Sequence, residues 1–145
     1  MKQSVLQNIA YSFLLIVIVA AVSGCVTYKQ LYENAQDLVD QGRYGEAMNV
    51  YMKAVDRRPD DAFATMELSK VSKVVFNDAL NDFNAAVADS TFEKALNAFE
   101  NVKRIKRRLV PYNIVLDIPQ ESYDAAAYSR RRHVEQQFEK GYNLM

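Results

Sequence analysis

Few side chains in this chain could perform catalytic or metal chemistry, and little in their spacing brings them together. There is one cysteine, Cys25, and one histidine, His133, which follows three arginines. A surface position explains that histidine more simply than a role as a general base. Helix capping and a solvated helix face explain the acidic pairs Asp60–Asp61 and Asp78/Asp82 equally well. We therefore predict no enzyme.

Composition narrows the classes of protein further. The chain has 145 residues, half of them apolar and a quarter charged, with only 4 Gly and 3 Pro. That is enough for one domain with a core, and too few turn residues for a typical sandwich or barrel. One Cys and one His cannot supply an ordinary tetrahedral metal site, and no phosphate-binding loop or nucleotide fingerprint occurs. We predict no metal and no cofactor.

The first 25 residues form a segment of their own. An apolar run extends from Ile9 to Val22, after a single early cation at Lys2. A run of roughly 14 residues is short for a membrane span and suits the apolar part of a secretion signal. The small residues Ser23 and Gly24 then precede Cys25, which suits a peptidase that needs an unhindered backbone.

This segment resembles the signal of a bacterial lipoprotein precursor, because Val22-Ser23-Gly24-Cys25 matches the lipobox in every position. The resemblance implies a signal peptide over 1–24, cleavage between Gly24 and Cys25, and covalent lipid on Cys25. Two or more acyl chains hold a protein stably on a bilayer. Val26 after the cysteine implies the periplasmic face of the outer membrane. The alternative is an inner-membrane protein with an uncleaved anchor.

Downstream of Cys25 the apolar residues recur at helical spacing, which predicts an all-α domain over 25–145. The positions Leu31, Ala35 and Leu38 mark one helix, and Ala47, Val50, Tyr51, Ala54 and Val55 mark a second. Gly42 between them and Pro59 after them predict a turn and a stop. The sequence thus predicts an antiparallel hairpin over 28–61.

That hairpin resembles a tetratricopeptide (TPR) repeat. The residues that carry the likeness are Gly42, Tyr44, Ala47, Tyr51, Ala54 and Pro59. Ala47 and Ala54 are small, so we expect the two helices to pack closely, with the tyrosines between them. The spacing recurs, degraded, as Phe92, Ala95, Phe99 and Val102. The offset is 48 residues rather than 34, and the excess is close to four helical turns. We therefore expect a degenerate hairpin over 61–109, whose first helix is long, about 61–88, with a capping box at Ser90–Glu93 before a helix over 91–109. The long helix should carry one continuous apolar stripe and a polar opposite side. The stripe comprises Ala64, Leu68, Val71, Val75, Ala79, Phe83 and Ala86.

The last part of the chain changes character twice. Residues 111–119 are β-branched and bracketed by prolines, which predicts an extended connector over about 110–119. A helix over 120–143 should follow, with Tyr123, Ala127, Arg131, Val134, Phe138, Tyr142 and Met145 on one stripe. We expect this helix to fold back partly on the 91–109 helix and to leave Phe138 and Tyr142 for a partner.

Basic residues gather in two clusters of the C-terminal third. Positions 25–101 carry 8 basic and 13 acidic side chains, and positions 102–145 carry 9 and 5. A basic patch for acidic headgroups or an acidic protein surface is one interpretation, and solvated helix ends are the other. Nucleic acid is not expected, since no aromatic residues alternate with the cations. The patch would comprise Lys103, Arg104, Lys106, Arg107, Arg108, Arg130, Arg131 and Arg132.

These observations together predict a non-enzymatic adaptor or assembly factor, held to the membrane by its lipid and bound to another envelope protein. In TPR proteins the first helix of each hairpin lines the binding face, and the corresponding residues here are Lys29, Tyr32, Gln36 and Asp40. The alternative is a structural lipoprotein that forms a homo-oligomeric ring or filament through its own apolar stripes.

Overall fold

The computed structural model describes residues 27–142, and over that range the chain is all-α. Gly24, Cys25 and Met145, which carry sequence predictions, lie outside the described residues. The elements are α2 (Tyr28–Asp40), α3 (Tyr44–Arg57), α4 (Ala62–Ala88), α5 (Phe92–Leu109), the short 3₁₀ helix η1 (Val110–Tyr112) and α6 (Gln120–Tyr142). These bounds agree closely with the hairpin predicted over 28–61 and with the helices predicted over 61–88, 91–109 and 120–143.

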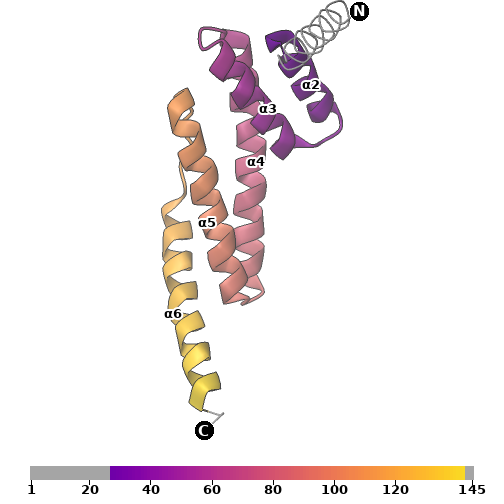
Figure 1. The fold of residues 1–145 in the computed structure, drawn as a ribbon. Coiled ribbons are helices and arrows are strands. Elements are labelled where there is room, and N and C mark those ends of the chain that lie inside the picture. The colour runs from indigo at the N-terminus through magenta and orange to yellow at the C-terminus, as the bar shows by residue number, and fades with distance from the viewer. Residues whose placement is uncertain (1–26, 143–145) are drawn as a thin grey trace, which may run out of the picture.

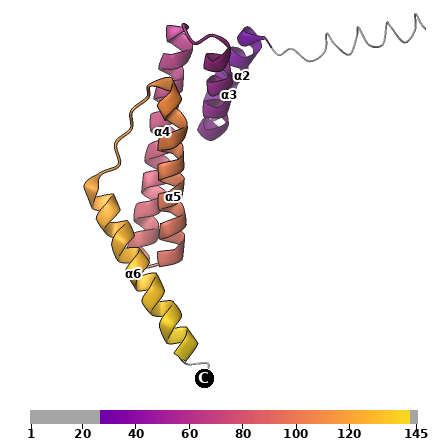
Figure 2. The same ribbon diagram turned by 60° about the vertical axis from the view of Figure 1, so that its left-hand side comes forward.

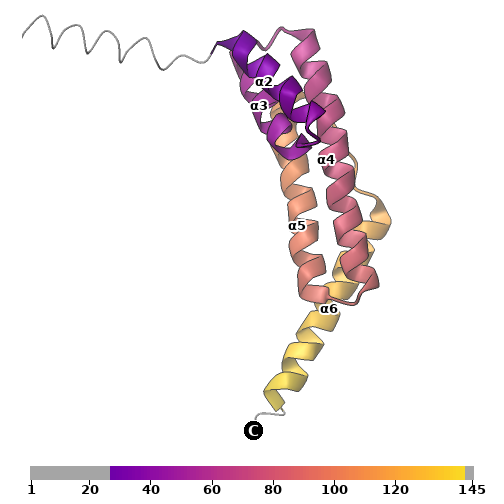
Figure 3. The same ribbon diagram turned by 90° about the vertical axis from the view of Figure 1, so that its right-hand side faces the viewer.

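Consecutive helices run antiparallel, and each packs against the next along the chain (Figure 1). The α2–α3 hairpin lies against the N-terminal part of α4, as the view in Figure 3 shows. The longer α4–α5 hairpin continues past it, and α6 packs on α5 and touches α4. The molecule is therefore an elongated stack of helices.

The two helices of the first hairpin pack against each other through small residues. Ala35 of α2 and Ala47 and Ala54 of α3 are fully buried, and the Tyr51 ring lies beside them. Tyr51 contacts the ring of Tyr32 edge-on, with 5.7 Å between centroids. Alanines let two helices approach closely, and the rings fill the space between them. The prediction of a close-packed hairpin is confirmed.

The turn after α2 depends on a left-handed residue. Gly42 has φ +72°, which costs a glycine little because it has no Cβ. The amide of Gly42 donates to the carbonyl of Val39 at 2.9 Å, and that of Arg43 donates to Leu38 at 2.8 Å. This is the Schellman pattern of helix ends, which satisfies carbonyls that the helix leaves open.

The turn after α4 repeats that pattern without a glycine. Ser90 takes φ +55°, its amide donates to Val87 at 3.0 Å, and the amide of Thr91 donates to Ala86 at 3.0 Å. The predicted capping box at Ser90–Glu93 is wrong, because Ser90 is the left-handed turn residue. The hydroxyl of Thr91 donates back to the carbonyl of Ala86 and caps nothing in α5.

The long helix α4 buries the apolar stripe that its sequence predicts. Asn77, Asp78, Asn81, Asp82 and Asn84 are exposed on the other side. Phe83 of the stripe meets Phe99 of α5 with 5.1 Å between ring centroids. The buried positions of α4 are Ala64, Leu68, Val71, Ser72, Phe76, Ala79, Phe83 and Ala86, with Val75 half-buried.

The connector is extended over a shorter range than predicted. Residues 110–112 form η1, because proline fits the first turn of a helix, and Asn113 then ends it with φ +55°. Beyond that, Ile114, Leu116 and Ile118 are buried and the residues between them are exposed. This alternation is the signature of an extended chain with one face on a core. Figure 2 shows the segment descending beside α5 to the start of α6.

The N-terminal half of α6 folds back as predicted, but on another face. Ser122, Ala126 and Ser129 are buried against the hairpin, whereas Tyr123 and Tyr128 remain 41 % and 48 % exposed. The two tyrosine rings meet the α5 rings of Phe99 and Phe92 edge-on, with 5.3 and 6.0 Å between centroids. The buried hydroxyl of Ser129 has no hydrogen-bond partner in the described chain. Ser129 therefore contributes to the packing of α6 through its small side chain and not through a hydrogen bond.

The close approach at Ala47 leads to a first prediction. The side chain is fully buried, so Ala47→Leu should overpack the hairpin and lower the free energy of unfolding by about 1–3 kcal/mol. Urea unfolding measures the change. Lys53→Ala, on the exposed side of the same helix, is the control and should shift it by less than about 0.5 kcal/mol. Equal, negligible shifts would contradict close packing.

The start of α4 leads to a second prediction. Asp61 accepts hydrogen bonds from the hydroxyl of Tyr28 at 2.7 Å and from the amide of Ala64 at 3.0 Å. The tyrosine hydroxyl, and then the amide, hold the pKa of Asp61 below its ordinary value. A carboxylate with a lowered folded pKa stabilises above its unfolded pKa of about 3.9, and the effect disappears as pH falls through the folded value.

Asp61→Asn should therefore lower the melting temperature at pH 7, and the deficit should shrink as the pH falls from 5 to 2. Thermal melts followed by circular dichroism over that range provide the measurement. Asp60→Asn is the matched control, since Asp60 accepts no hydrogen bond in the described chain. A deficit that stays constant down to pH 2 would show that the charge of Asp61 is unimportant.

Candidate partner-binding surfaces

The predicted α2 face exists as a row along one side of that helix. Lys29, Gln36 and Asp40 are exposed, and Tyr32 is half-buried between Tyr28 and Tyr51. Lys29 pairs with Glu33 at 3.6 Å, and both side chains stay largely exposed, so the pair costs little to break. This row offers polar contacts around one tyrosine that the hairpin holds in place.

The predicted basic patch does not form one surface. Arg104 and Arg108 lie on the side of α5 that faces α3, where Arg108 donates to the side-chain oxygen of Asn49 at 2.6 Å. Lys106 instead approaches Asp117 of the connector at 3.7 Å. On α6, Arg132 pairs with Glu135 at 2.6 Å. Helical geometry explains the division, because adjacent residues point about 100° apart.

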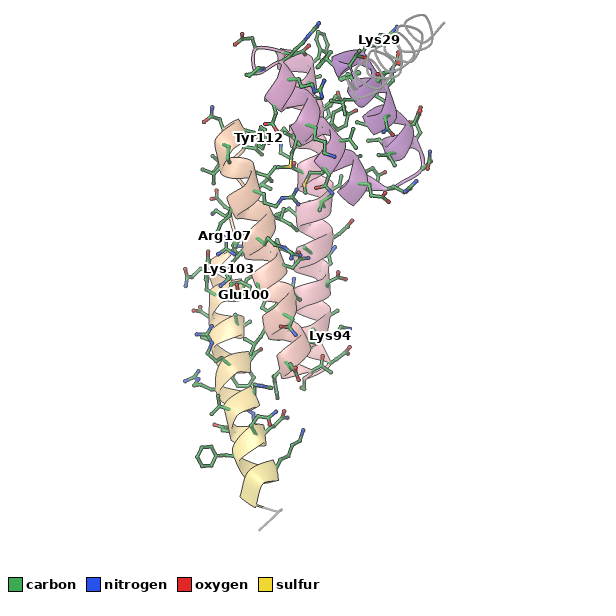
Figure 4. The ribbon with its side chains drawn as sticks, viewed as in Figure 1. Lys29, Lys94, Glu100, Lys103, Arg107 and Tyr112 are labelled. Carbon is green, nitrogen blue, oxygen red and sulfur yellow. The ribbon has the colours of Figure 1, made fainter. Side chains whose placement is uncertain are left out.

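One basic cluster does form, between α5 and α6. Glu100 pairs with Lys103 at 2.5 Å, and this hydrogen bond lowers the pKa of Glu100, with weaker help from the charges of Arg107 and Arg130. Glu100, Lys103 and Arg107 lie at the edge of α5 next to α6 (Figure 4). Three cations around one carboxylate leave a net positive edge, which suits an acidic partner surface or anionic headgroups.

The C-terminal half of α6 extends beyond the turn between α4 and α5 (Figure 3). Val134 and Phe138 lie on this part and are 52 % and 70 % exposed. Tyr142 is the last residue of α6. Large apolar side chains gathered on one exposed helix face are unusual on a monomer surface and mark sites of association. This half of α6 is the strongest candidate for partner contact.

A groove that the sequence did not reveal lies between α4, the end of α3 and the connector. Its volume is about 1150 Å³, above the 300–1000 Å³ of typical small-molecule pockets. Met66 of α4 and Val115 of the connector are exposed apolar residues of its walls. One residue in the sequence could have indicated this groove: Met66 is apolar but lies off the buried stripe of α4.

No family model, curated protein or solved structure matches this chain. Across residues 27–142, none of the helices combines the length and apolar character needed to cross a membrane. The same residues contain no group of acidic, histidine or cysteine side chains arranged to bind a metal ion.

Proposed function

We propose that this chain is a lipid-anchored adaptor or assembly factor that binds another protein of the bacterial envelope through its helical body. The observation that carries the proposal is the exposed apolar half of α6, with Val134 and Phe138, at the end of the molecule far from the α2–α3 hairpin. A helix that leaves such side chains uncovered gains stability when a partner covers them.

The proposed anchor is covalent lipid on Cys25, supported by the lipobox Val22-Ser23-Gly24-Cys25. The proposed location is the periplasmic face of the outer membrane, supported by Val26. The TPR-like spacing of the α2–α3 and α4–α5 hairpins supports an interaction module, in which the row around Tyr32 is the second contact surface. The basic edge between α5 and α6 would favour an acidic partner.

The anchor gives the third prediction. Thioether formation requires the thiol, so Cys25→Ser should yield a full-length precursor without lipid. Metabolic labelling with a palmitate analogue, followed by mass spectrometry of the N-terminus, measures both outcomes. Gly24→Ala keeps a small residue at the cut and should still be labelled. Equal label on the wild type and on Cys25→Ser would contradict the lipoprotein assignment.

The adaptor role gives the fourth prediction. Phe138 is 70 % exposed, so Phe138→Asp should change the free energy of unfolding by less than about 0.5 kcal/mol. It should nevertheless reduce capture of the partner from crosslinked envelopes by about tenfold, since an exposed aromatic anchor is worth 1–2 kcal/mol or more at an interface. The buried Phe99→Ala is the control for folding, with a loss of about 3–5 kcal/mol.

Two results would redirect the proposal. If Phe138→Asp destabilises the fold and leaves capture unchanged, the binding surface is to be sought around Tyr32 and Gln36. If the wild type self-associates in sedimentation experiments and Phe138→Asp abolishes that association, the chain is a structural subunit rather than an adaptor.

A further inference from the structure

The start of α2 is fixed to the turn between α3 and α4. The hydroxyl of Tyr28, the first residue of α2, donates to Asp61 at 2.7 Å. The guanidinium of Arg58 lies over the same tyrosine ring, 4.5 Å from its centroid. Asp61 also caps α4, because it accepts a hydrogen bond from the amide of Ala64 at 3.0 Å. These contacts join the starts of α2 and α4 at one end of the molecule, as Figure 1 shows.

The chain leads from this end to Cys25, the proposed site of the lipid. Thr27 caps the N-terminus of α2 and lies two positions after Cys25. Two residues of fully extended chain span about 7 Å. A cysteine that carries lipid lies at the bilayer surface, so a link this short keeps the start of α2 close to that surface. The contacts of Tyr28 keep the α3–α4 turn and the start of α4 there as well.

A large apolar side chain is exposed at this end of the molecule. Phe63 is the second residue of α4, two positions after Asp61, and is 70 % exposed. The hairpin packing therefore does not use this ring. Aromatic and aliphatic side chains held at a membrane surface enter the boundary between headgroups and acyl chains, where their apolar surface leaves water. A bilayer next to the start of α4 would cover Phe63 in this way.

The charged groups at this end balance one another. Lys29 lies near the start of α2 and pairs with Glu33 at 3.6 Å (Figure 4). The α3–α4 turn carries two cations and two carboxylates, which are Arg57, Arg58, Asp60 and Asp61. A surface with both signs of charge suits the phosphate and ammonium groups of zwitterionic headgroups, and it does not call for an anionic lipid. The contact is therefore expected to depend on Phe63 more than on net charge.

We propose that the end of the molecule formed by the start of α2, the α3–α4 turn and the first turn of α4 rests on the phospholipid bilayer, with the ring of Phe63 inserted at the headgroup boundary. The inference rests on the lipid anchor of the proposed function, and it assigns the end of the helical body that faces the membrane. The C-terminal half of α6 lies at the opposite end of the stack (Figure 1). This orientation directs Phe138 away from the bilayer, where a partner can reach it.

The sequence contains no tryptophan, so a single introduced tryptophan reports its own surroundings. The test compares Phe63→Trp, Val74→Trp and Phe138→Trp in the full chain. Val74 lies on the same face of α4 as Phe63, about three turns and about 16 Å further along the helix. Phe138 matches Phe63 in exposure, at 70 %, and belongs to the opposite end. Because all three side chains are exposed, each variant should keep the melting temperature of the wild type.

Each variant is purified from envelopes and reconstituted in phosphatidylcholine vesicles, with or without bromine atoms near the top of the acyl chains, which quench a nearby indole. We expect bromine to reduce the fluorescence of Phe63→Trp about twofold or more, and to leave Val74→Trp and Phe138→Trp within about 10 % of their unquenched values. Joint quenching of Phe63→Trp and Val74→Trp would show that the molecule lies on its side. That result, quenching of Phe138→Trp, or no quenching of Phe63→Trp would overturn the proposal.

Mass spectrometry of the same samples separates this inference from the anchor on which it rests. Lipid on Cys25 without quenching of Phe63→Trp would overturn the membrane-facing end and leave the lipoprotein assignment intact. Selective quenching of Phe63→Trp on a chain that carries no lipid would support the membrane contact and overturn the lipoprotein assignment. A chain with neither lipid nor quenching would overturn both.

Discussion

The difference in length between α3 and α4 is the constraint on which the rest of the structure depends. The 14 residues of α3 span about 21 Å, while the 27 residues of α4 span about 40 Å. The apolar stripe of α4 runs from Ala64 to Ala86, so α3 can cover only part of it. The rest has to be covered by α5, and α6 in turn packs on α5 and reaches α4.

The turns show how the long hairpin keeps the geometry of the short one. Gly42, Ser90 and Asn113 all take positive φ. In each case the amide of that residue donates to the carbonyl three residues earlier, and the next amide donates to the carbonyl five residues before it. The pattern depends on the backbone, so serine and asparagine replace glycine at a modest cost in strain. The extra length of the second hairpin is therefore taken up as whole helical turns, and the face toward the core is preserved.

Two of the candidate surfaces, the C-terminal half of α6 and the groove beside the connector, lie where one helix is no longer covered by its neighbour. The connector occupies the side of α5 near η1, so α6 starts lower and its C-terminal half passes the α4–α5 turn, which leaves Val134 and Phe138 without cover. At the other end, the space between α4 and the connector remains as the groove beside Val115. Both surfaces thus follow from the same offset of α6 along the stack.

The sequence by itself determined the helices, because the 3.6-residue period, Gly42 and Pro59 at the ends of the first two helices, and the unbroken apolar stripe of the long helix are local properties. It determined the stripe of α4 and the close contact at Ala47 in the same way. It did not determine which face of α6 is buried, since the stripe through Tyr123 and Phe138 and the small face through Ser122, Ala126 and Ser129 both have helical spacing. Only the packed structure decided this. The face of α6 that packs on α5 is the one with the smallest side chains, because Ser122, Ala126 and Ser129 allow the two helices to approach closely, while Tyr123 and Tyr128 stay partly exposed and contact the rings of Phe99 and Phe92 edge-on.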